Sequence, residues 1–158
     1  MKSLEEKLPL SEAVTHVLEE CRMVLPGIQA LFGFQLIAVF NSTFRERLSS
    51  TEQSFHLVAI ALIAMAVALV MAPAALHRQT SPHAATQDFI TIATRLLLMS
   101  MFPLMLAISI DFYLIARLIL NKTLTSLFLS AVLLMLFTIL WFLLPRLNSF
   151  QKILRGAK

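Results

Sequence analysis

The chain has 158 residues, of which 58% are hydrophobic and only 14% are charged, and its mean hydropathy is +0.81. This composition lies outside the range of soluble globular domains and is typical of a chain embedded mostly in a lipid bilayer. The net charge of +4 comes from basic residues that flank apolar runs, so it indicates membrane topology and argues against a nucleic-acid partner.

The first predicted element is an amphipathic helix within residues 1–23. Its apolar side repeats at helical spacing and lies opposite acidic residues. The apolar positions are Leu10, Val14, Val17, Leu18 and Cys21. Pro26-Gly27 follows, and a proline inside a helix removes a backbone donor. We therefore expect this helix to break or kink where the chain enters the bilayer.

Four apolar runs come next, and about 20 helical residues are needed to cross the hydrocarbon core. The runs cover residues 24–41, 55–76, 89–120 and 124–144. The pattern from Ser50 to Gln53 is typical of a capping box and predicts that the second span begins before Phe55. Ser81-Pro82 predicts a helix start in the next connection. No heptad array stands out in these runs.

Short connections and the tail complete the expected architecture. Only residues 121–123 separate the third and fourth runs, which predicts an antiparallel hairpin. After Pro145, apolar and basic residues alternate and predict a basic interfacial helix over residues 145–158, which either pairs with the acidic N-terminal helix or lies on the membrane separately. The prediction is an all-α integral membrane four-helix bundle with a single domain, 1–158.

The basic residues divide unequally between the two ends of the predicted bundle. Nine lie at the end that holds both termini, and four lie at the other end. By the positive-inside rule, both termini are expected in the cytoplasm.

Polar residues inside the apolar runs are the first candidates for function, because a polar side chain in hydrocarbon is costly. Threading the spans places Gln35, His56 and Asp111 at similar depth, and Ser100 shares a helix stripe with Asp111. These four residues are the candidate polar path. Asp111 has three alternative roles: a structural partner, paired with Arg117 or capping the first span; a carrier of an ion or proton; or an exposed interfacial acid.

A second candidate site is cationic and lies at the end of the termini. It comprises His77, Arg78 and Arg95, which could bind lipid phosphate or a small anion. The alternative is that these residues anchor the spans at the membrane surface, with Arg95 snorkelling to the headgroups.

The sequence predicts no cofactor, metal or catalytic residues. His56 and His77 lie on one predicted helix at opposite membrane faces, so they cannot ligate one haem. The many methionines are typical of gap-filling in an apolar core. No nucleophile and base occur together, so we do not expect an enzyme.

Several motifs resemble those of a known but uncharacterised family. They are Gly33-Phe34-Gln35-Leu36, Phe55-His56-Leu57, Pro73-Ala74-Ala75-Leu76-His77-Arg78, and Thr94-Arg95-Leu96 continuing through Pro103 to Asp111. The resemblance is to small bacterial four-helix integral membrane proteins that form a domain of unknown function, and it covers residues 18–120. It implies the bacterial inner membrane and supplies no activity.

Two functions follow as hypotheses. One is an ion channel or carrier, expected to be a homo-oligomer because four helices leave little room for an internal path, with small ions and the lipid bilayer as its partners. The alternative is a non-catalytic membrane scaffold or partner subunit.

Overall fold

The computed structural model describes residues 9–80 and 86–147. Within these ranges, four helices are long and apolar enough to cross a membrane, so the chain is a multi-pass membrane protein. The elements in chain order are α1 (Leu10–Ala38), the short α2 (Ser42–Arg47), α3 (Ser50–Thr80), α4 (Gln87–Leu120), α5 (Thr123–Thr138), a π-helical turn η1 (Ile139–Leu143) and a 3-10 turn η2 (Leu144–Arg146). The predicted all-α membrane bundle is confirmed.

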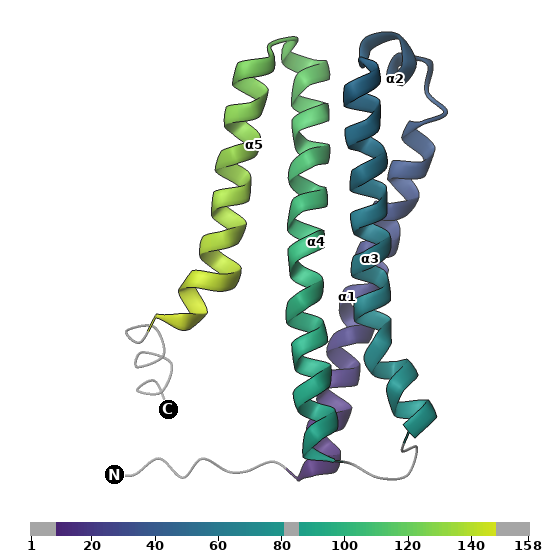
Figure 1. Cartoon of the computed structure of the whole chain (residues 1–158), viewed down its shortest axis with the longest axis vertical. Coiled ribbons are helices and arrows are strands. Elements are labelled where there is room, and N and C mark those ends of the chain that lie inside the picture. The colour runs from purple at the N-terminus through teal and green to yellow at the C-terminus, as the bar shows by residue number, and fades with distance from the viewer. Residues whose placement is uncertain (1–8, 81–85, 148–158) are drawn as a thin grey trace.

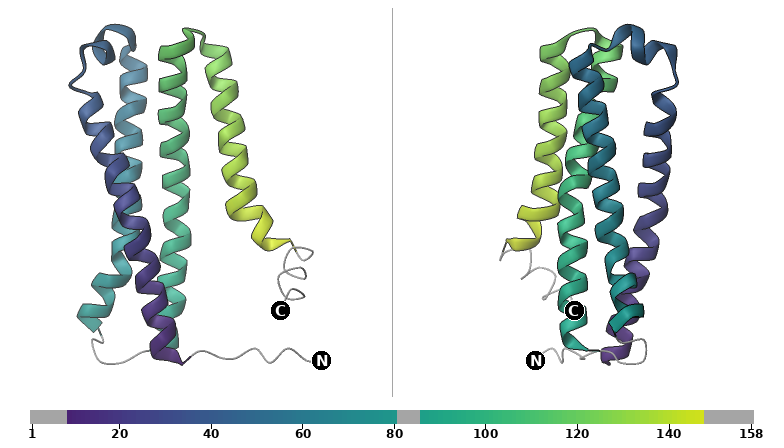
Figure 2. Two further views of the ribbon diagram at one scale, coloured as in Figure 1. Left: turned by 180° about the vertical axis from the view of Figure 1, so that it is seen from behind. Right: turned by 45° about the vertical axis from the view of Figure 1, so that its right-hand side comes forward.

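The four long helices are not equally embedded (Figure 1). α1, α3 and α4 pack against one another, and α5 makes its main contacts with α4 alone. Figure 2 shows α5 diverging from the other helices toward its C-terminal end. We call the end with α2 and the α4–α5 turn the α2 end. The other end, where α1 begins and α3 finishes, is the opposite end.

The expected break at Pro26-Gly27 is wrong. α1 continues through Pro26 as one helix, so the amphipathic segment and the first span form a single element. Pro26 is exposed, and its ring therefore does not disturb the packed side of the helix. A proline is tolerated in a membrane helix when local adjustment satisfies the freed carbonyl group.

Two of the three helix-boundary predictions can be compared directly with the structure. α3 begins at Ser50, before Phe55, as predicted. Asn121 adopts a left-handed conformation (φ 52°) and Lys122 follows, so the α4–α5 turn is as short as the sequence indicates. Ser81-Pro82 lies outside the described residues, and α4 begins at Gln87 with Thr86 as its N-cap. Residues 148–158 of the predicted basic tail also lie outside them.

A seven-residue repeat organises the packed side of α1, α3 and α4, which sequence inspection missed. Buried positions recur at that spacing in α1 (Val14, Cys21, Ile28, Gln35). In α4 one set of buried positions does so (Ala93, Ser100, Ala107, Leu114), and further buried residues lie between them. In α3 the buried residues alternate by four and three: Glu52, His56, Ala59, Ile63, Ala66, Val70 and Pro73. This is the spacing of coiled-coil packing. We call this three-helix contact the seam.

Small side chains allow the helices to approach one another closely at the seam. Ala59, Ala66, Ala93 and Ala107 are completely buried. With only three glycines in the chain, alanine supplies the small side chains that membrane helices need at close contacts.

Serines rather than alanines mark the contact between α4 and α5. The Ser130 hydroxyl donates to the Ser109 carbonyl oxygen at 2.6 Å, and Ser126 is fully buried nearby on α5. The other side chains of α5 are largely exposed, which suits a helix whose outer surface contacts lipid.

Candidate functional site

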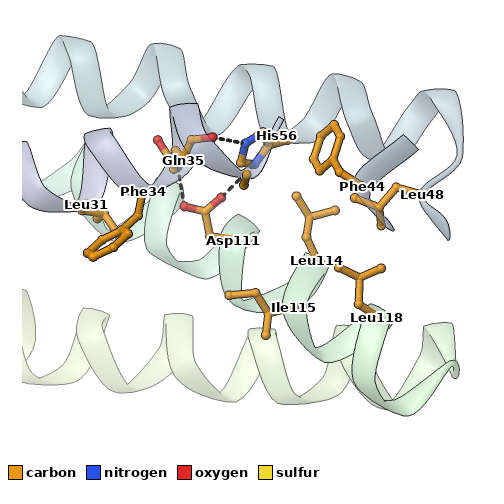
Figure 3. A pocket seen from close by; sticks show the side chains of 11 residues that line it. Leu31, Phe34, Gln35, Phe44, Leu48, His56, Asp111, Leu114, Ile115 and Leu118 are labelled. Carbon is orange, nitrogen blue, oxygen red and sulfur yellow. Dashed lines mark hydrogen bonds and ion pairs between the residues drawn. The ribbon is translucent and has the colours of Figure 1, made fainter. Parts of the chain in front are cut away.

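Three polar residues form a buried layer across the seam near the α2 end. Gln35 comes from the last turn of α1, His56 from the second turn of α3, and Asp111 from α4 (Figure 3). Gln35 and His56 are buried, and the Asp111 side chain is 14% exposed. The sequence prediction that these residues share one depth is confirmed. We call Gln35, His56 and Asp111 the polar layer.

Each member of the polar layer contacts the other two. His56 Nε2 lies 3.0 Å from the Gln35 carbonyl oxygen, and His56 Nδ1 lies 3.4 Å from Asp111 Oδ1. The Gln35 side-chain amide donates to Asp111 Oδ2. The Gln35 carbonyl belongs to the last turn of a helix, where carbonyls lack intrahelical partners. His56 therefore supplies a partner for a carbonyl at the C-terminal end of α1. Through its second ring nitrogen it also connects α3 to α4.

The partners of the two His56 ring nitrogens show where a proton can lie in the polar layer. A carbonyl oxygen can only accept, so His56 Nε2 carries a hydrogen and donates it to Gln35. His56 Nδ1 then faces a carboxyl oxygen, and two lone pairs at this position would repel each other. A proton on either Nδ1 or Oδ1 would turn this 3.4 Å contact into a hydrogen bond. The contact between His56 and Asp111 therefore offers one position for an exchangeable proton.

An apolar cavity of about 180 Å³ adjoins the polar layer on the side of the α2 end. Phe34 and Phe44 lie on either side of Asp111 in Figure 3, and Leu114 and Leu118 line the α4 wall. Phe44 also contacts the His56 ring edge-on, with centroids 5.0 Å apart. These apolar neighbours shield the pair from solvent and hold the imidazole in place.

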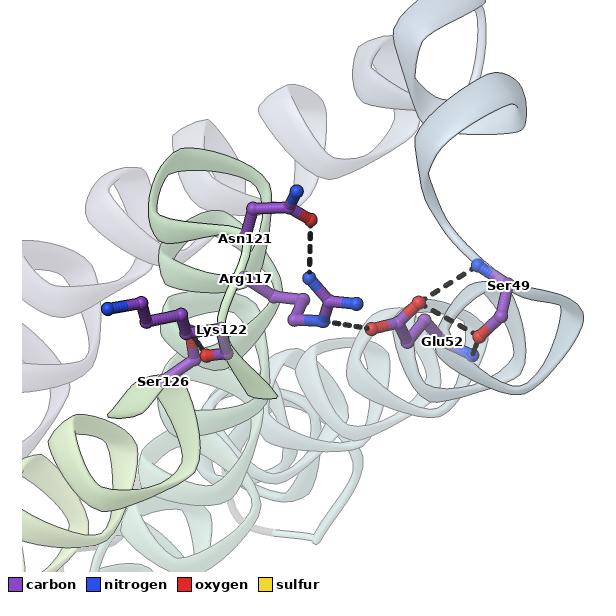
Figure 4. Close-up of polar contacts among 6 residues, drawn as sticks. All are labelled: Ser49, Glu52, Arg117, Asn121, Lys122 and Ser126. Carbon is purple, nitrogen blue, oxygen red and sulfur yellow. Dashed lines mark hydrogen bonds and ion pairs between the residues drawn. The ribbon is translucent and has the colours of Figure 1, made fainter. Parts of the chain in front are cut away.

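A second polar group lies beyond the cavity, toward the α2 end (Figure 4). Glu52 Oε1 lies 3.3 Å from Arg117 Nε, and Arg117 Nη1 donates to Asn121 Oδ1 at 2.9 Å. Arg117 therefore pairs with Glu52, and the proposed alternative that it pairs with Asp111 is wrong.

The same group contains the true start of α3. Ser49 N–H donates to Glu52 Oε2 at 2.9 Å, and Glu52 N–H donates to the Ser49 hydroxyl oxygen at 3.3 Å. This reciprocal pair is a capping box. It lies one residue before the Ser50–Gln53 pattern chosen from the sequence. Gln53 instead donates to the Leu48 carbonyl oxygen at 2.9 Å.

Ser100 does not join the polar layer, although it shares a stripe of α4 with Asp111. Eleven residues separate the two, which is about 16 Å along a helix axis. The Ser100 hydroxyl donates to the Leu97 carbonyl oxygen at 2.7 Å. Ser100 lines a different cavity, of about 410 Å³, together with Glu20, Thr94 and Trp141.

The predicted cationic cluster changes one member. His77 and Arg78 line a cavity of about 380 Å³ between α1 and α3, and Arg22 of α1 lines it with them. Arg95 is exposed on α4 and is not among the lining residues. Arg22 flanks the first span and was therefore a candidate in the sequence, but the expected break at Pro26 hid the side of the helix that it shares with the first span.

Metal ligation has little support in the described part of the chain. No group of three His, Cys, Asp or Glu side chains there is placed to hold an ion. His56 and Asp111 supply two ligand types, but their contacts are used within the polar layer.

Comparison with known proteins gives a family and no activity. A search of curated proteins and of solved structures finds no match. A family model described as a family of unknown function (DUF6328) matches residues 8–145. The match extends beyond residue 120, where the sequence resemblance ended, and includes all of α5. The chain therefore belongs to the family of unknown function DUF6328.

Proposed function

We propose that this protein is a small membrane carrier that moves protons or couples proton movement to another small ion. The observation that carries the proposal is the buried contact between His56 Nδ1 and Asp111 Oδ1, which offers a position for one exchangeable proton at membrane depth. Ionisable groups at membrane depth often mark proton and ion pathways. A carboxylate and an imidazole that share one proton can release it and take it back without a large change in packing.

An alternating carrier fits the molecule better than an open channel. Between the polar layer and the cavity beside Ser100, the packed residues are apolar, and they include Ile28, Leu104 and Ala107. Pro103 lies in this stretch of α4 and frees a backbone carbonyl, which favours local bending. Movement at this point would be needed to connect the two sides.

The proposed location is the bacterial inner membrane, with the opposite end of the bundle in the cytoplasm. The support is the excess of basic residues at that end and the positive-inside rule. Reporter fusions at each terminus, active only in the cytoplasm, are expected to give signal at both. Signal at only one terminus would contradict the four-span arrangement.

A homo-oligomer is the proposed working form, because four helices enclose little space and a path between protomers needs a second copy. Mass measurement of the protein in native-like lipid discs is expected to give a multiple of the chain mass. A single chain that retains flux would contradict this part of the proposal.

The carrier proposal is tested with Asp111→Asn in liposomes. Asparagine can accept from Gln35 and donate to neutral His56, so the bundle keeps its contacts while the exchangeable proton is lost. Proton flux driven by a pH gradient is expected to fall to the level of empty liposomes. The matched control is Asp88→Asn, which changes an exposed acid in the first turn of α4 and is expected to retain flux.

The scaffold hypothesis is favoured by a different observation. Two pairs of ionisable groups near the α2 end form within the chain, His56 with Asp111 and Glu52 with Arg117. Pairs of this kind can have a purely structural role, in which they fix the register of neighbouring helices and take no part in transport. Wild-type liposomes that pass no protons, alkali cations, divalent cations or halides under either polarity would overturn the carrier proposal and leave the scaffold in its place.

A further inference from the structure

The cavity between α1 and α3 at the opposite end combines positive charge with an apolar wall. Arg22 of α1 and Arg78 of α3 line it from two helices, and His77 lies beside Arg78. Its volume of about 380 Å³ is within the size range of small-molecule sites. None of the three residues of the polar layer lines this cavity.

The two guanidinium groups are available to a ligand. Across residues 9–80 and 86–147, no carboxylate forms an ion pair with Arg22 or Arg78. Of the nearby acids on α1, Glu19 lies 3.7 Å from His16, and Glu20 lines the separate cavity beside Trp141. The His77 ring packs against Phe89, with centroids 5.3 Å apart, which holds the end of α3 close to the start of α4.

The rest of the cavity wall is apolar. Leu18 and Leu25 come from α1, and Val70, Met71 and Ala74 come from α3. A free inorganic anion would use the arginines and gain nothing from this wall. A ligand with a phosphate group and an attached hydrocarbon chain would use both, because the arginines can bind the phosphate and the wall can bury the chain.

We propose that this cavity binds the phosphate headgroup of an anionic phospholipid, with Arg22 and Arg78 as its ligands. Basic pockets between membrane helices are typical sites for anionic headgroups. The proposal does not depend on the carrier function, because it concerns the other end of the molecule and a different set of residues.

Cys21 provides a reporter for this site, since it is the single cysteine of the chain and lines the cavity. The protein is placed in lipid discs of phosphatidylcholine, or of equal parts phosphatidylcholine and phosphatidylglycerol. Alkylation of Cys21 by N-ethylmaleimide is then followed, and lipid retained by the purified protein is measured by native mass spectrometry. Phosphatidylglycerol is expected to slow alkylation severalfold and to remain bound.

The test variant is Arg22→Gln/Arg78→Gln, and the matched control is Arg95→Gln, which removes an exposed arginine from the same end. Each arginine near an anionic headgroup contributes roughly a factor of five to affinity, so the double variant is expected to retain about twenty-five-fold less phosphatidylglycerol. It should also lose the protection of Cys21. The control should keep most of both effects.

Three results would overturn the proposal. The first is an equal loss of retained lipid in the double variant and in Arg95→Gln, which would indicate general attraction to a charged surface. The second is protection of Cys21 by inorganic phosphate in phosphatidylcholine discs, which would indicate a free-anion site. The third is retention of phosphatidylglycerol by the double variant at the wild-type level. If N-ethylmaleimide alkylates Cys21 in neither kind of disc, the measurement of retained lipid still decides between these outcomes.

Discussion

Asp111→Leu is expected to destabilise the protein by about 3–5 kcal/mol, because it removes one partner from a buried ionic contact and leaves the others unsatisfied. His56 Nδ1 would lose the group that faces it, and the Gln35 amide would lose its acceptor. Asp111→Asn should cost about 1 kcal/mol or less, since the amide can replace both contacts once His56 is neutral. Thermal or denaturant unfolding in detergent measures the difference.

A double-variant cycle shows whether the cost comes from the pair itself. His56→Leu/Asp111→Leu removes both ionisable groups, and apolar replacement of both partners is often tolerated better than removal of one. The double variant is therefore expected to be more stable than Asp111→Leu alone. The control Asp88→Leu changes an exposed acid and should stay within about 1 kcal/mol of wild type. Additive losses at His56 and Asp111 would contradict the proposed shared proton.

The polar layer was predictable because depth in a membrane helix follows from distance along the chain. Gln35 and Asp111 each lie within long apolar runs, and His56 lies shortly after a connection, so counting residues from the turns placed them together. The hydrogen bonds were not predictable in the same way. The use of the Gln35 carbonyl by His56 depends on where α1 ends, and helix ends are uncertain by a residue or two.

Ser100 shows the limit of a periodicity argument. Its phase on α4 matches that of Asp111, as the sequence indicates, but phase says nothing about what fills the space between two turns. The side chains of Leu104 and Ala107 occupy that interval in the packed core. The residues therefore border separate cavities in this conformation.

The seam was missed for a different physical reason. In a soluble coiled coil, polar residues on the outer faces make the apolar repeat visible. Here the outer faces contact lipid and are apolar as well, so Ala59 and Ala61 look alike in the sequence. What distinguishes the seam is small size and complete burial, which become apparent only when the helices are packed together.

The predicted cationic cluster included Arg95 and omitted Arg22 because a helix break was expected at Pro26. If the helix had broken at Pro26, the helical positions before the break would not predict which side of the first span those residues share. Because α1 is continuous, Arg22 keeps the phase that brings it beside His77 and Arg78. Arg95 was chosen for its place in the sequence near the same membrane surface. It belongs to α4, and the residues that line the cavity come from α1 and α3.

Enlarging the seam at Ala59 is expected to have the second large effect. Ala59 is fully buried and lies three residues after His56, while Ala61 is exposed on the same helix. Ala59→Leu adds three carbon atoms where α3 packs closely in the core, and overpacking of this kind costs about 1–3 kcal/mol. Ala61→Leu adds the same atoms on the exposed face and should change stability by less than about 0.5 kcal/mol.

The two alanine variants also separate packing from proton chemistry. Moving α3 away from α4 would lengthen the 3.4 Å contact between His56 Nδ1 and Asp111 Oδ1. Ala59→Leu should therefore weaken the interaction through which the two side chains share a proton, while both side chains remain present. Proton flux should then fall in Ala59→Leu and stay at the wild-type level in Ala61→Leu. Equal stability of the two variants would contradict the close packing of the seam. Full flux in a destabilised Ala59→Leu would show that the His56–Asp111 contact is structural, because a carrier needs that contact intact.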